Sequence, residues 1–510
     1  MTTFARLLQG ASLSWGRVLV MLAAQILTVP IFLGQWGGER FGHWLVLNGM
    51  LGYQSLLSTA FQQFTYGEAL RLGPSSVELV SRLYFASLPV AYLVALCELL
   101  VVLLFGMTLI GFVMPEGAES TKQVLYLILV VFTLVNAFLM PFGSITSQTL
   151  TIWGYFPYVA ADGLLRAVTS SFAPAVAVFL GASLKSAGIV LIAAHALPAT
   201  VTTVLWARAA KRERLFQSSR FEWKRGFLNL FRSLPLAGQT FVALFRQQGI
   251  RLVLSSEISV SSVAAFSTTR TFANVLQKGL PTIVAPLMPE LMRYVAKVDQ
   301  VRMEGAFAVV WLAVLAILTP ASLLLLVVAE PVFSTWTRGQ VPFDAVLFVS
   351  LSATVLIFGC GQPAMAVLRG RNLVAWQTVV SVVLALSVLV LLVLFLPLFG
   401  LRGVGYGLLA SEVVATSLAF WACQSELHRL GLRVPWKSAG LAVGGVATAS
   451  TFAAIAVGLG SGGKVFLSLA VTSNLICLVL FWRSLSTTAR DYFRAALERI
   501  IRRLTRSKQR

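Results

Sequence analysis

The chain has 510 residues, of which 57% are hydrophobic and only 12% are charged, and its formal net charge at pH 7 is +21. A soluble domain cannot bury this share of apolar side chains, because folding leaves much of its surface in water. Runs of about 20 apolar residues recur along the sequence, and each can cross a hydrocarbon core about 30 Å thick. The composition therefore excludes a soluble globular protein and predicts an all-α polytopic membrane protein.

The apolar runs predict about 14 transmembrane helices, within a range of 12 to 14. They lie near residues 18–36, 44–64, 84–107, 122–142, 164–183, 187–207, 235–256, 262–286, 305–328, 344–366, 373–397, 403–423, 438–459 and 464–482. The first run has no small-x-small cleavage site, so we interpret it as a retained span rather than a signal peptide. The second, seventh and eighth runs are the most polar, which is typical of helices that face a bundle interior.

Lysine and arginine positions predict the orientation of the chain. If the N-terminus is cytoplasmic and the spans alternate, 30 of the 40 basic residues fall on the inner side, including Arg166, and six fall in outer loops. Cytoplasmic loops of membrane proteins carry this excess of positive charge. We therefore expect a multi-pass protein of the cell (inner) membrane with an even number of spans and both termini in the cytoplasm.

Two cytoplasmic segments hold much of the positive charge, the loop 208–232 and the tail 483–510. Their cations can attract anionic lipids of the inner leaflet. In the loop, basic residues alternate with the aromatic residues Phe221, Trp223, Phe227 and Phe231, which predicts an amphipathic helix at the membrane interface. Membrane lipids are therefore the expected partners of these segments, and nucleic acid is not.

The sequence assembles no catalytic or metal-binding motif. The stretch GLGSGGKV (458–465) resembles a phosphate-binding loop, but Val465 stands where a serine or threonine would hold Mg²⁺, and no strand precedes it. His43, His195 and His428 are scattered, and the four cysteines have no CxxC spacing. We therefore predict no catalytic residue, no metal and no cofactor, and a protein that is not an enzyme.

Three carboxylates fall in or beside predicted spans: Glu98 in the third, Glu257 at the end of the seventh and Glu412 in the twelfth. An ionised side chain in lipid is costly, so each of them should face the bundle interior. Each is a candidate for a coupling residue that carries a proton. The alternative is that each is a charge partner for an interior arginine or a hydrogen-bonded structural acid.

The seventh and eighth spans contain four cations, Arg246, Arg251, Arg270 and Lys278. On the eighth span, Arg270, Asn274 and Lys278 recur every four residues and share one helix face. Glu257, between the two pairs, cannot neutralise all four charges. Because arginine binds phosphate through a planar, bidentate fork, we predict a wet central cavity for an anionic, phosphorylated cargo. The predicted substrate-binding residues are Arg246, Arg251, Arg270, Asn274 and Lys278.

A second interpretation of these cations stays open. Long basic side chains can extend to a membrane face, which suits Lys278 and Arg251 better than Arg246. They can also pair with Glu98 or Glu412.

Four stretches resemble motifs of one transporter family. They are GERFGHWLVL (38–47), SSVAAFSTTRTFANVLQKGLPTIVAPLMPELMRY (261–294), LLLVVAEPVFSTWTRG (324–339) and LPLFGLRGVGYGLLASEVV (396–414). In order and spacing they are similar to the polysaccharide transporters and oligosaccharide flippases of the multidrug/oligosaccharidyl-lipid/polysaccharide exporter superfamily. Many of these relatives carry an aspartate where the seventh span has Arg251, so a role assigned to that aspartate does not transfer.

The resemblance implies two six-helix lobes around a central cavity that opens alternately to each side, followed by two C-terminal helices. In this sequence the N-terminal lobe would be 1–210, a basic loop 211–234, the C-terminal lobe 235–430, two extra spans 431–485 and a basic tail 486–510. The implied cargo is a lipid-linked, anionic saccharide carried on undecaprenyl diphosphate. The implied partners include polysaccharide polymerase and synthesis machinery.

The predicted function is therefore a flippase or exporter that moves a lipid-linked oligosaccharide or polysaccharide precursor across the cytoplasmic membrane. One alternative is a drug/cation antiporter of the same fold, for whose lipophilic cations a basic cavity is ill suited. Another is a membrane component of a polysaccharide synthesis complex that does not itself transport.

Overall fold

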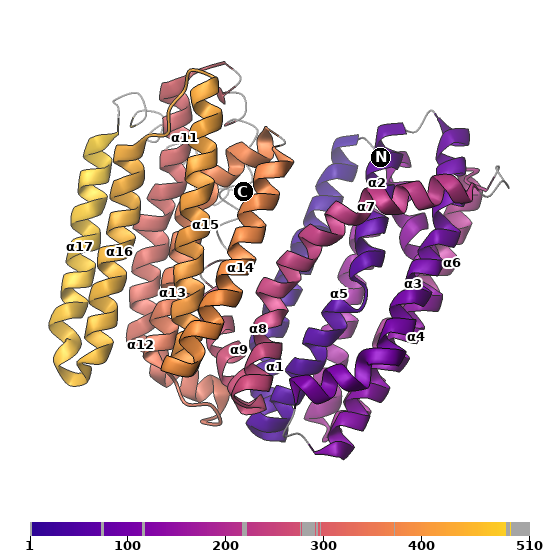
Figure 1. Ribbon diagram of the computed structural model, residues 1–510, viewed down its shortest axis with the longest axis horizontal. Coiled ribbons are helices and arrows are strands. Elements are labelled where there is room, and N and C mark those ends of the chain that lie inside the picture. The colour runs from indigo at the N-terminus through magenta and orange to yellow at the C-terminus, as the bar shows by residue number, and fades with distance from the viewer. Residues whose placement is uncertain are drawn as a thin grey trace, which may run out of the picture. The chain divides into compact units, whose positions relative to one another are not determined.

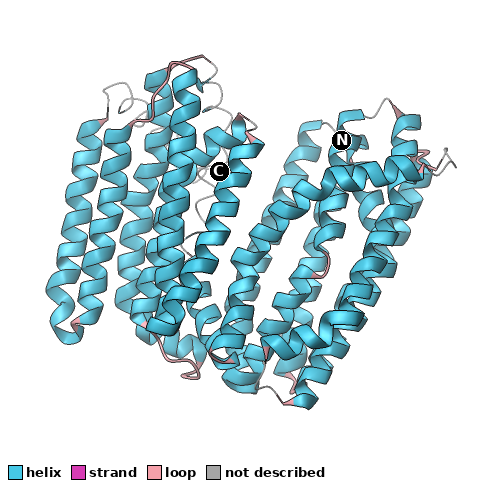
Figure 2. Cartoon of the chain, in the orientation of Figure 1, coloured by secondary structure: helices cyan, strands magenta, loops and turns pink. Residues whose placement is uncertain are grey.

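The computed structural model describes most of the chain. The described residues are 3–72, 76–114, 118–216, 222–275, 297–371 and 373–485, together with 277, 291, 294, 295 and 490. Every regular element in these ranges is helical (Figure 2), which confirms the predicted all-α class. Ten of the helices in them are long and apolar enough to cross a membrane. The chain is a multi-pass membrane protein.

The chain divides into two compact units. The first comprises Met1–Ser267 and Trp336–Val341, and the second comprises Thr268–Thr335 and Pro342–Arg510. The boundary after Ser267 falls inside the predicted eighth span. The short segment Trp336–Val341 belongs to the first unit although it comes much later in the chain. The lobe boundaries predicted from the sequence stay predictions.

The first unit is a bundle of long helices (Figure 1). Its elements are α1 (Thr3–Tyr53), α2 (Leu56–Leu72), α3 (Val77–Val113), α4 (Glu119–Leu150), η1 (Thr151–Trp153), α5 (Phe156–Phe179), α6 (Leu184–Arg212), α7 (Trp223–Leu244), η2 (Phe245–Gly249), α8 (Ile250–Glu257) and the start of α9 (Val260–Asn274). The seventh predicted span is thus built from α7, η2 and α8.

A glycine elbow divides α1 into the first predicted span and the beginning of the second. Gly37 has φ of 71°, a left-handed conformation that glycine adopts without a Cβ penalty. Five residues on, a Cβ at Gly42 would collide with the backbone carbonyl of Val260, so only glycine allows this approach. The motif GERFG (38–42), part of the stretch that carries the family resemblance, therefore follows the elbow directly.

A second break follows between α1 and α2, at Gln54 and Ser55, in the middle of the predicted second span. A helix that begins there exposes its first amide N–H groups, which have no partner within the helix. This break places free backbone donors inside the first unit.

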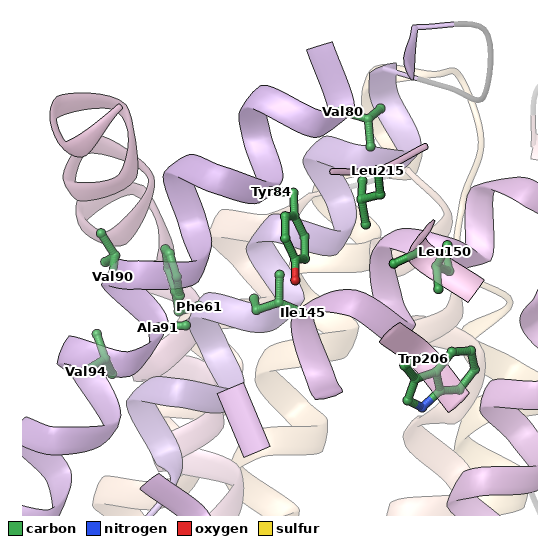
Figure 3. Packing of buried hydrophobic residues seen from close by; sticks show 11 residues of the cluster. Phe61, Val80, Tyr84, Val90, Ala91, Val94, Ile145, Leu150, Trp206 and Leu215 are labelled. Atoms are coloured by element: carbon green, nitrogen blue, oxygen red, sulfur yellow. The ribbon is translucent and has the colours of Figure 1, made fainter. Parts of the chain in front are cut away.

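The apolar core of the first unit surrounds Tyr84 of α3 (Figure 3). The buried residues of this cluster are Phe61, Val80, Tyr84, Val90, Ala91, Val94, Ile145, Leu150, Trp206, Ala210 and Leu215. They come from α2, α3, α4, α6 and the turn after α6. The Tyr84 hydroxyl lies 3.0 Å from Oγ1 of Thr146, which satisfies the polar end of a fully buried ring.

The region predicted as a basic loop, 211–234, contains the start of α7. Gly226 brings α7 against the backbone of Ala86 in α3, where a side chain would not fit, and Figure 1 shows α7 crossing the ends of neighbouring helices of this unit. Trp223 and Phe227 stack with ring centroids 6.3 Å apart, and both are exposed, as is Phe231. The aromatic face that predicts interfacial binding is therefore on the surface; its binding to lipid stays a prediction.

The second unit is also helical. Its described elements are the end of α9, α11 (Gln300–Ala313), η4 (Val314–Leu318), α12 (Thr319–Thr337), α13 (Ala345–Gly370), α14 (Val374–Phe399), α15 (Leu401–Arg429), α16 (Trp436–Gly458), η5 (Gly460–Gly463) and α17 (Lys464–Ser484). The phosphate-loop-like stretch 458–465 is thus the turn between α16 and α17.

A widened turn, η4, interrupts the helix that runs from α11 to α12. The N–H of Thr319 bonds the carbonyl of Val314, five residues back, and the next residue, Pro320, has no N–H to continue this pattern to Leu315. Nδ2 of Asn474, on α17, donates instead to the Leu315 carbonyl at 3.0 Å. A side chain of the last span thereby completes the hydrogen bonding of α11–α12.

Candidate functional site

A polar cavity of about 190 Å³ lies inside the first unit, between α2, α3, α4 and α6. Its lining residues are Gln54, Ser55, Ser58, Thr59, Gln62, Ala95, Glu98, Thr133, Asn136, Ala137, Met140, Pro141, Ser144 and His195. Most of them are polar, although the helices that supply them belong to a membrane-spanning bundle. Polar groups at this depth are retained for a pathway, a ligand or a structural hydrogen bond.

Glu98 is the acidic residue of this cavity, and it caps the break in the second span. Its carboxylate accepts hydrogen bonds from the backbone N–H of Ser58, at 2.9 Å, and from the Ser58 hydroxyl, at 2.5 Å. Ser58 lies in the first turn of α2, whose amide groups carry partial positive charge. Glu98 is thus held at a helix N-terminus, where a carboxylate is favoured.

His195 and Asn136 also line this cavity. Nε2 of His195 lies 2.8 Å from Oδ1 of Asn136, and the imidazole packs on the ring of Phe132 at a centroid distance of 4.7 Å. No sequence pattern joins these residues, because they lie 59 positions apart. Their role as part of a polar wall is therefore a finding of the structure.

Arg166, which the sequence places on the inner side of the membrane, lies inside α5, ten residues after the helix begins at Phe156. Its place on the cytoplasmic side stays a prediction. Its guanidinium pairs with Asp162 one turn earlier, with Nε and Oδ1 2.8 Å apart, and donates to Oγ1 of Thr202 on α6 at 2.8 Å. It also contacts Sδ of Met140, which lines the cavity. The i, i+4 acid–base pair neutralises the arginine locally, which makes its place within the bundle possible.

Arg251 is the best described of the predicted cargo-binding residues. It lies in the first turn of α8, and its Nη1 donates to Oε1 of Gln248 at 2.9 Å. Its Nε is buried and has no hydrogen-bond partner. No carboxylate lies within ion-pair distance of Arg251 in the described ranges of the chain. Among the described residues Arg251 is therefore a cation without an acidic partner; its part in a cargo site stays a prediction.

The turn that carries Arg246 and Gln248 is the π-helical η2. Gly249 allows this turn to approach α1, since a Cβ there would lie 2.6 Å from Cδ2 of Phe245 and 3.0 Å from the Tyr53 hydroxyl. That hydroxyl is itself buried without a hydrogen-bond partner. Single π turns within α-helices are frequent at functional sites.

The structure places the other predicted residues separately. Arg270 and Asn274 lie in the part of α9 that belongs to the second unit, both half-buried, whereas Arg246 and Arg251 belong to the first. Lys278 and the side chain of Arg246 lie outside the described residues. The proposed convergence of these side chains on one cavity stays a prediction.

Of the three candidate coupling acids, Glu98 faces the cavity. Glu412 is buried in α15 of the second unit, and Glu257 is exposed at the end of α8. In the described part of the chain, no group of three or more histidine, cysteine, aspartate or glutamate residues could hold a metal ion.

Solved transporters share this fold. A multidrug resistance MATE family transporter of the MOP superfamily, in an inward-facing conformation, matches with a TM-score of 0.63 and 15% identity, over 82% of this chain and 99% of that chain. The lipid II flippase MurJ, in an inward closed conformation, matches with a TM-score of 0.65 and 11% identity, over 92% of this chain and 98% of that chain. The Vibrio cholerae MATE transporter VcmN, in its bent form, matches with a TM-score of 0.53 and 14% identity, over 84% and 98%.

No family model matches the sequence, and no curated protein matches it. The similarity to the solved structures covers nearly their whole length, so the chain is a multi-pass membrane protein with the fold of these transporters. The two six-helix lobes and the central cavity that the sequence resemblance implies stay predictions.

Proposed function

We propose that the protein is a flippase or exporter that moves an oligosaccharide or polysaccharide precursor, linked to undecaprenyl diphosphate, across the cytoplasmic membrane by alternating access. The fold supports transport, because its structural neighbours include MATE transporters and a lipid II flippase. The sequence motifs support the polysaccharide branch of the superfamily. Both termini are proposed to be cytoplasmic, and polysaccharide synthesis machinery to be the partner.

The single observation that supports the choice of cargo is that the Arg251 guanidinium has no carboxylate partner among the described residues. A buried cation without an acid costs free energy, which an anionic ligand would offset. Arginine suits a diphosphate because its fork of N–H groups matches phosphate oxygens. A lipophilic cation, the cargo expected of a drug antiporter, would be repelled by the same charge.

The direction of the Arg251 side chain argues against extension to the near membrane face. Its bond to Gln248 turns the guanidinium back along the helix, away from the end of α8 at Glu257. Side chains on helices generally lean this way, toward the N-terminus. The charge therefore stays within the span, where a cargo headgroup could reach it.

The test is a flipping assay with the full-length protein in liposomes. A fluorescent undecaprenyl-diphosphate oligosaccharide is placed in both leaflets, and a membrane-impermeant quencher follows how fast the inner pool becomes accessible. Wild-type protein should speed the exchange, and Arg246→Ala, Arg251→Ala and Arg270→Ala should each reduce the rate at least about tenfold, the loss of 1.4 kcal/mol or more expected for a charge-assisted phosphate contact.

The matched control is Arg82→Ala, which removes an exposed arginine of α3 that pairs with Glu78 at 2.6 Å. It should flip lipid at the wild-type rate. Flipping at the wild-type rate by all three arginine-to-alanine variants would overturn the assignment of these residues to the cargo site. Transport of a lipophilic cation with no movement of the lipid-linked saccharide would overturn the proposed cargo and favour the antiporter.

A further inference from the structure

Basic side chains gather at one end of the second unit, where α13 ends and where α15 turns into α16. The stretches 365–371 and 421–440 contain five lysines and arginines but a single acid, Glu426. The five exposed basic residues are Arg369, Arg371, Arg429, Arg433 and Lys437. The orientation of a membrane protein depends on the number of such charges near its spans. Their arrangement in this unit is a further property, which a headgroup of opposite charge can use.

A buried carboxylate holds two of these arginines side by side. Glu426 is 7% exposed, and its Oε1 accepts a hydrogen bond from Nε of Arg371 at 3.1 Å. Its Oε2 lies 4.0 Å from Nη1 of Arg429. The side chains of the two arginines are 41% and 76% exposed, so both guanidinium groups reach the surface. A single carboxylate shared by two guanidinium groups leaves positive charge in excess at this point.

The turn between α15 and α16 is fixed by side-chain hydrogen bonds to its backbone. Oε1 of Gln424 accepts from the N–H of Val434 at 2.9 Å. Gln300, the first residue of α11, accepts from the N–H of Arg433 at 3.0 Å and donates to its carbonyl at 2.8 Å. Gln300 also donates to Glu304 at 2.7 Å, which engages an acid of α11 close to this turn. The backbone that carries the cations is therefore preorganised, and a ligand would not have to order it.

Tryptophans mark the depth at which this end of the unit leaves the hydrocarbon. Trp376, in the first turn of α14, meets Trp421 of α15 edge to face, with ring centroids 5.2 Å apart. Trp421 is 58% exposed, and Trp436, at the start of α16, is 53% exposed. Tryptophan gathers at the membrane–water interface because its ring is apolar and its N–H is polar. The nearby arginines therefore lie at the depth of lipid headgroups.

The surface that continues from this tryptophan pair into the membrane is apolar. Val379, Val382 and Leu386 follow Trp376 along one face of α14, and all three are exposed. Arginine matches the oxygens of a phosphate through its planar fork. A phospholipid brings a phosphate and acyl chains together, whereas a soluble phosphate would leave the apolar face of α14 uncovered. The combination of arginines, tryptophans and this apolar face thus favours a lipid.

We propose that the second unit binds an anionic phospholipid, with the phosphate between Arg371 and Arg429 and an acyl chain along the Trp376 face of α14. Glu426 positions the two guanidinium groups, and the bound lipid links the ends of α13, α14 and α15. The predicted orientation of the chain puts this site in the cytoplasmic leaflet, whose surface carries anionic lipid. None of these residues belongs to the proposed cargo site, so the proposal does not depend on the nature of the cargo.

The test measures lipid binding without any cargo. The purified, delipidated full-length protein is titrated with dioleoyl phosphatidylglycerol or dioleoyl phosphatidylcholine, and native mass spectrometry counts the bound lipids at one ionic strength, so that screening stays fixed. We expect one phosphatidylglycerol to bind at least about tenfold more tightly than phosphatidylcholine, whose choline cation the arginines repel. Combined replacement of Arg371→Gln and Arg429→Gln should abolish this preference, because the phosphate loses its charge-assisted hydrogen bonds.

The matched control is the combination of Arg71→Gln and Arg82→Gln. It removes the same charge from two arginines of the first unit that pair with acids of their own helices, and it should keep the wild-type preference. The double variant of the site leaves Glu426 buried without a partner, which can impair folding. Addition of Glu426→Gln removes this unpaired charge, so the triple variant keeps the proposal falsifiable.

Equal binding of the two lipids by the wild-type protein, or an unchanged preference in the triple variant, would overturn the proposal. Displacement of phosphatidylglycerol by inorganic phosphate would reveal a site for a soluble anion. Displacement by an undecaprenyl-diphosphate saccharide, added in a separate titration, would assign these arginines to the cargo. Either displacement overturns the choice of a phospholipid. Because the first titration contains no saccharide, its result stands apart from success or failure of the flipping assay.

Discussion

The indole Nε1 of Trp336 donates a hydrogen bond to the backbone carbonyl of Ile26, at 2.7 Å, across 310 residues of sequence. Pro30 lies four residues after Ile26 in α1 and has no N–H, so the helix cannot supply this bond itself. Trp336 opens the short segment Trp336–Val341 that belongs to the first unit although the helices on either side belong to the second. The end of α12, in the second half of the chain, thus completes the hydrogen bonding of the first span.

Replacement of this indole should loosen the segment. In Trp336→Phe the Ile26 carbonyl loses its donor, and we expect a loss of about 1 kcal/mol in stability, the usual size of one such bond. Thermal unfolding would measure it, and a cysteine placed at Gln340 should react faster with a maleimide in the variant. Trp223→Phe, an exposed indole, is the control; equal effects of the two substitutions would show that the bond contributes nothing.

The elbow of α1 allows a comparison within one motif. Gly42→Ala places a methyl group against the Val260 carbonyl and should cost about 1–3 kcal/mol, as overpacking does. Gly38→Ala, four residues earlier, meets open space and should be neutral. Thermal unfolding of both purified variants tests this; a Gly42→Ala protein as stable as Gly38→Ala would contradict the close approach.

Arg251 should show opposite effects on function and stability. Arg251→Gln removes a charge that has no acidic partner in the described ranges, so we expect an unfolding temperature equal to or above that of the wild type. The same variant should lose lipid flipping at least about tenfold. A marked drop in unfolding temperature would instead indicate a structural role for the arginine.

Asn474 should stabilise the second unit through the widened turn. Asn474→Leu leaves the Leu315 carbonyl without a donor and should cost about 0.6–1.7 kcal/mol, the range for side-chain hydrogen bonds between membrane helices. Thr472→Val, which alters an exposed hydroxyl bonded within its own helix, is the control. Unfolding in increasing denaturant would measure both, and matching midpoints would remove this role from Asn474.

The sequence predicts those features that follow from the chemistry of single residues. The apolar runs predict the membrane class, and the cost of charge in lipid marks Glu98 and Arg251 as residues that need an interior environment. The partner of Glu98 could not be predicted, because the N–H of Ser58 becomes available only through a break in the second predicted span, at residues 54 and 55, where the sequence has neither proline nor glycine.

Arg166 shows how far a helix can extend beyond its apolar run. The run begins near residue 164, which puts Arg166 at the start of the predicted span, whereas α5 begins at Phe156 and puts Arg166 in the interior of the helix. The sequence does contain a sign that the helix begins earlier, because Asp162 lies four residues before Arg166, at the spacing of a helical ion pair. His195 and Asn136 carried no such local signal, and only packing of α4 against α6 joins them.

The bond from Trp336 to Ile26 has a consequence for biosynthesis. The ribosome adds about 5–20 residues each second, so the 310 residues that separate the two partners take roughly 15–60 s to make. During that interval the Ile26 carbonyl, four residues before Pro30, lies in the first span without its hydrogen-bond donor. The N-terminal bundle is then the first part to be inserted into the membrane, but its hydrogen bonding is completed only after Trp336 has been made.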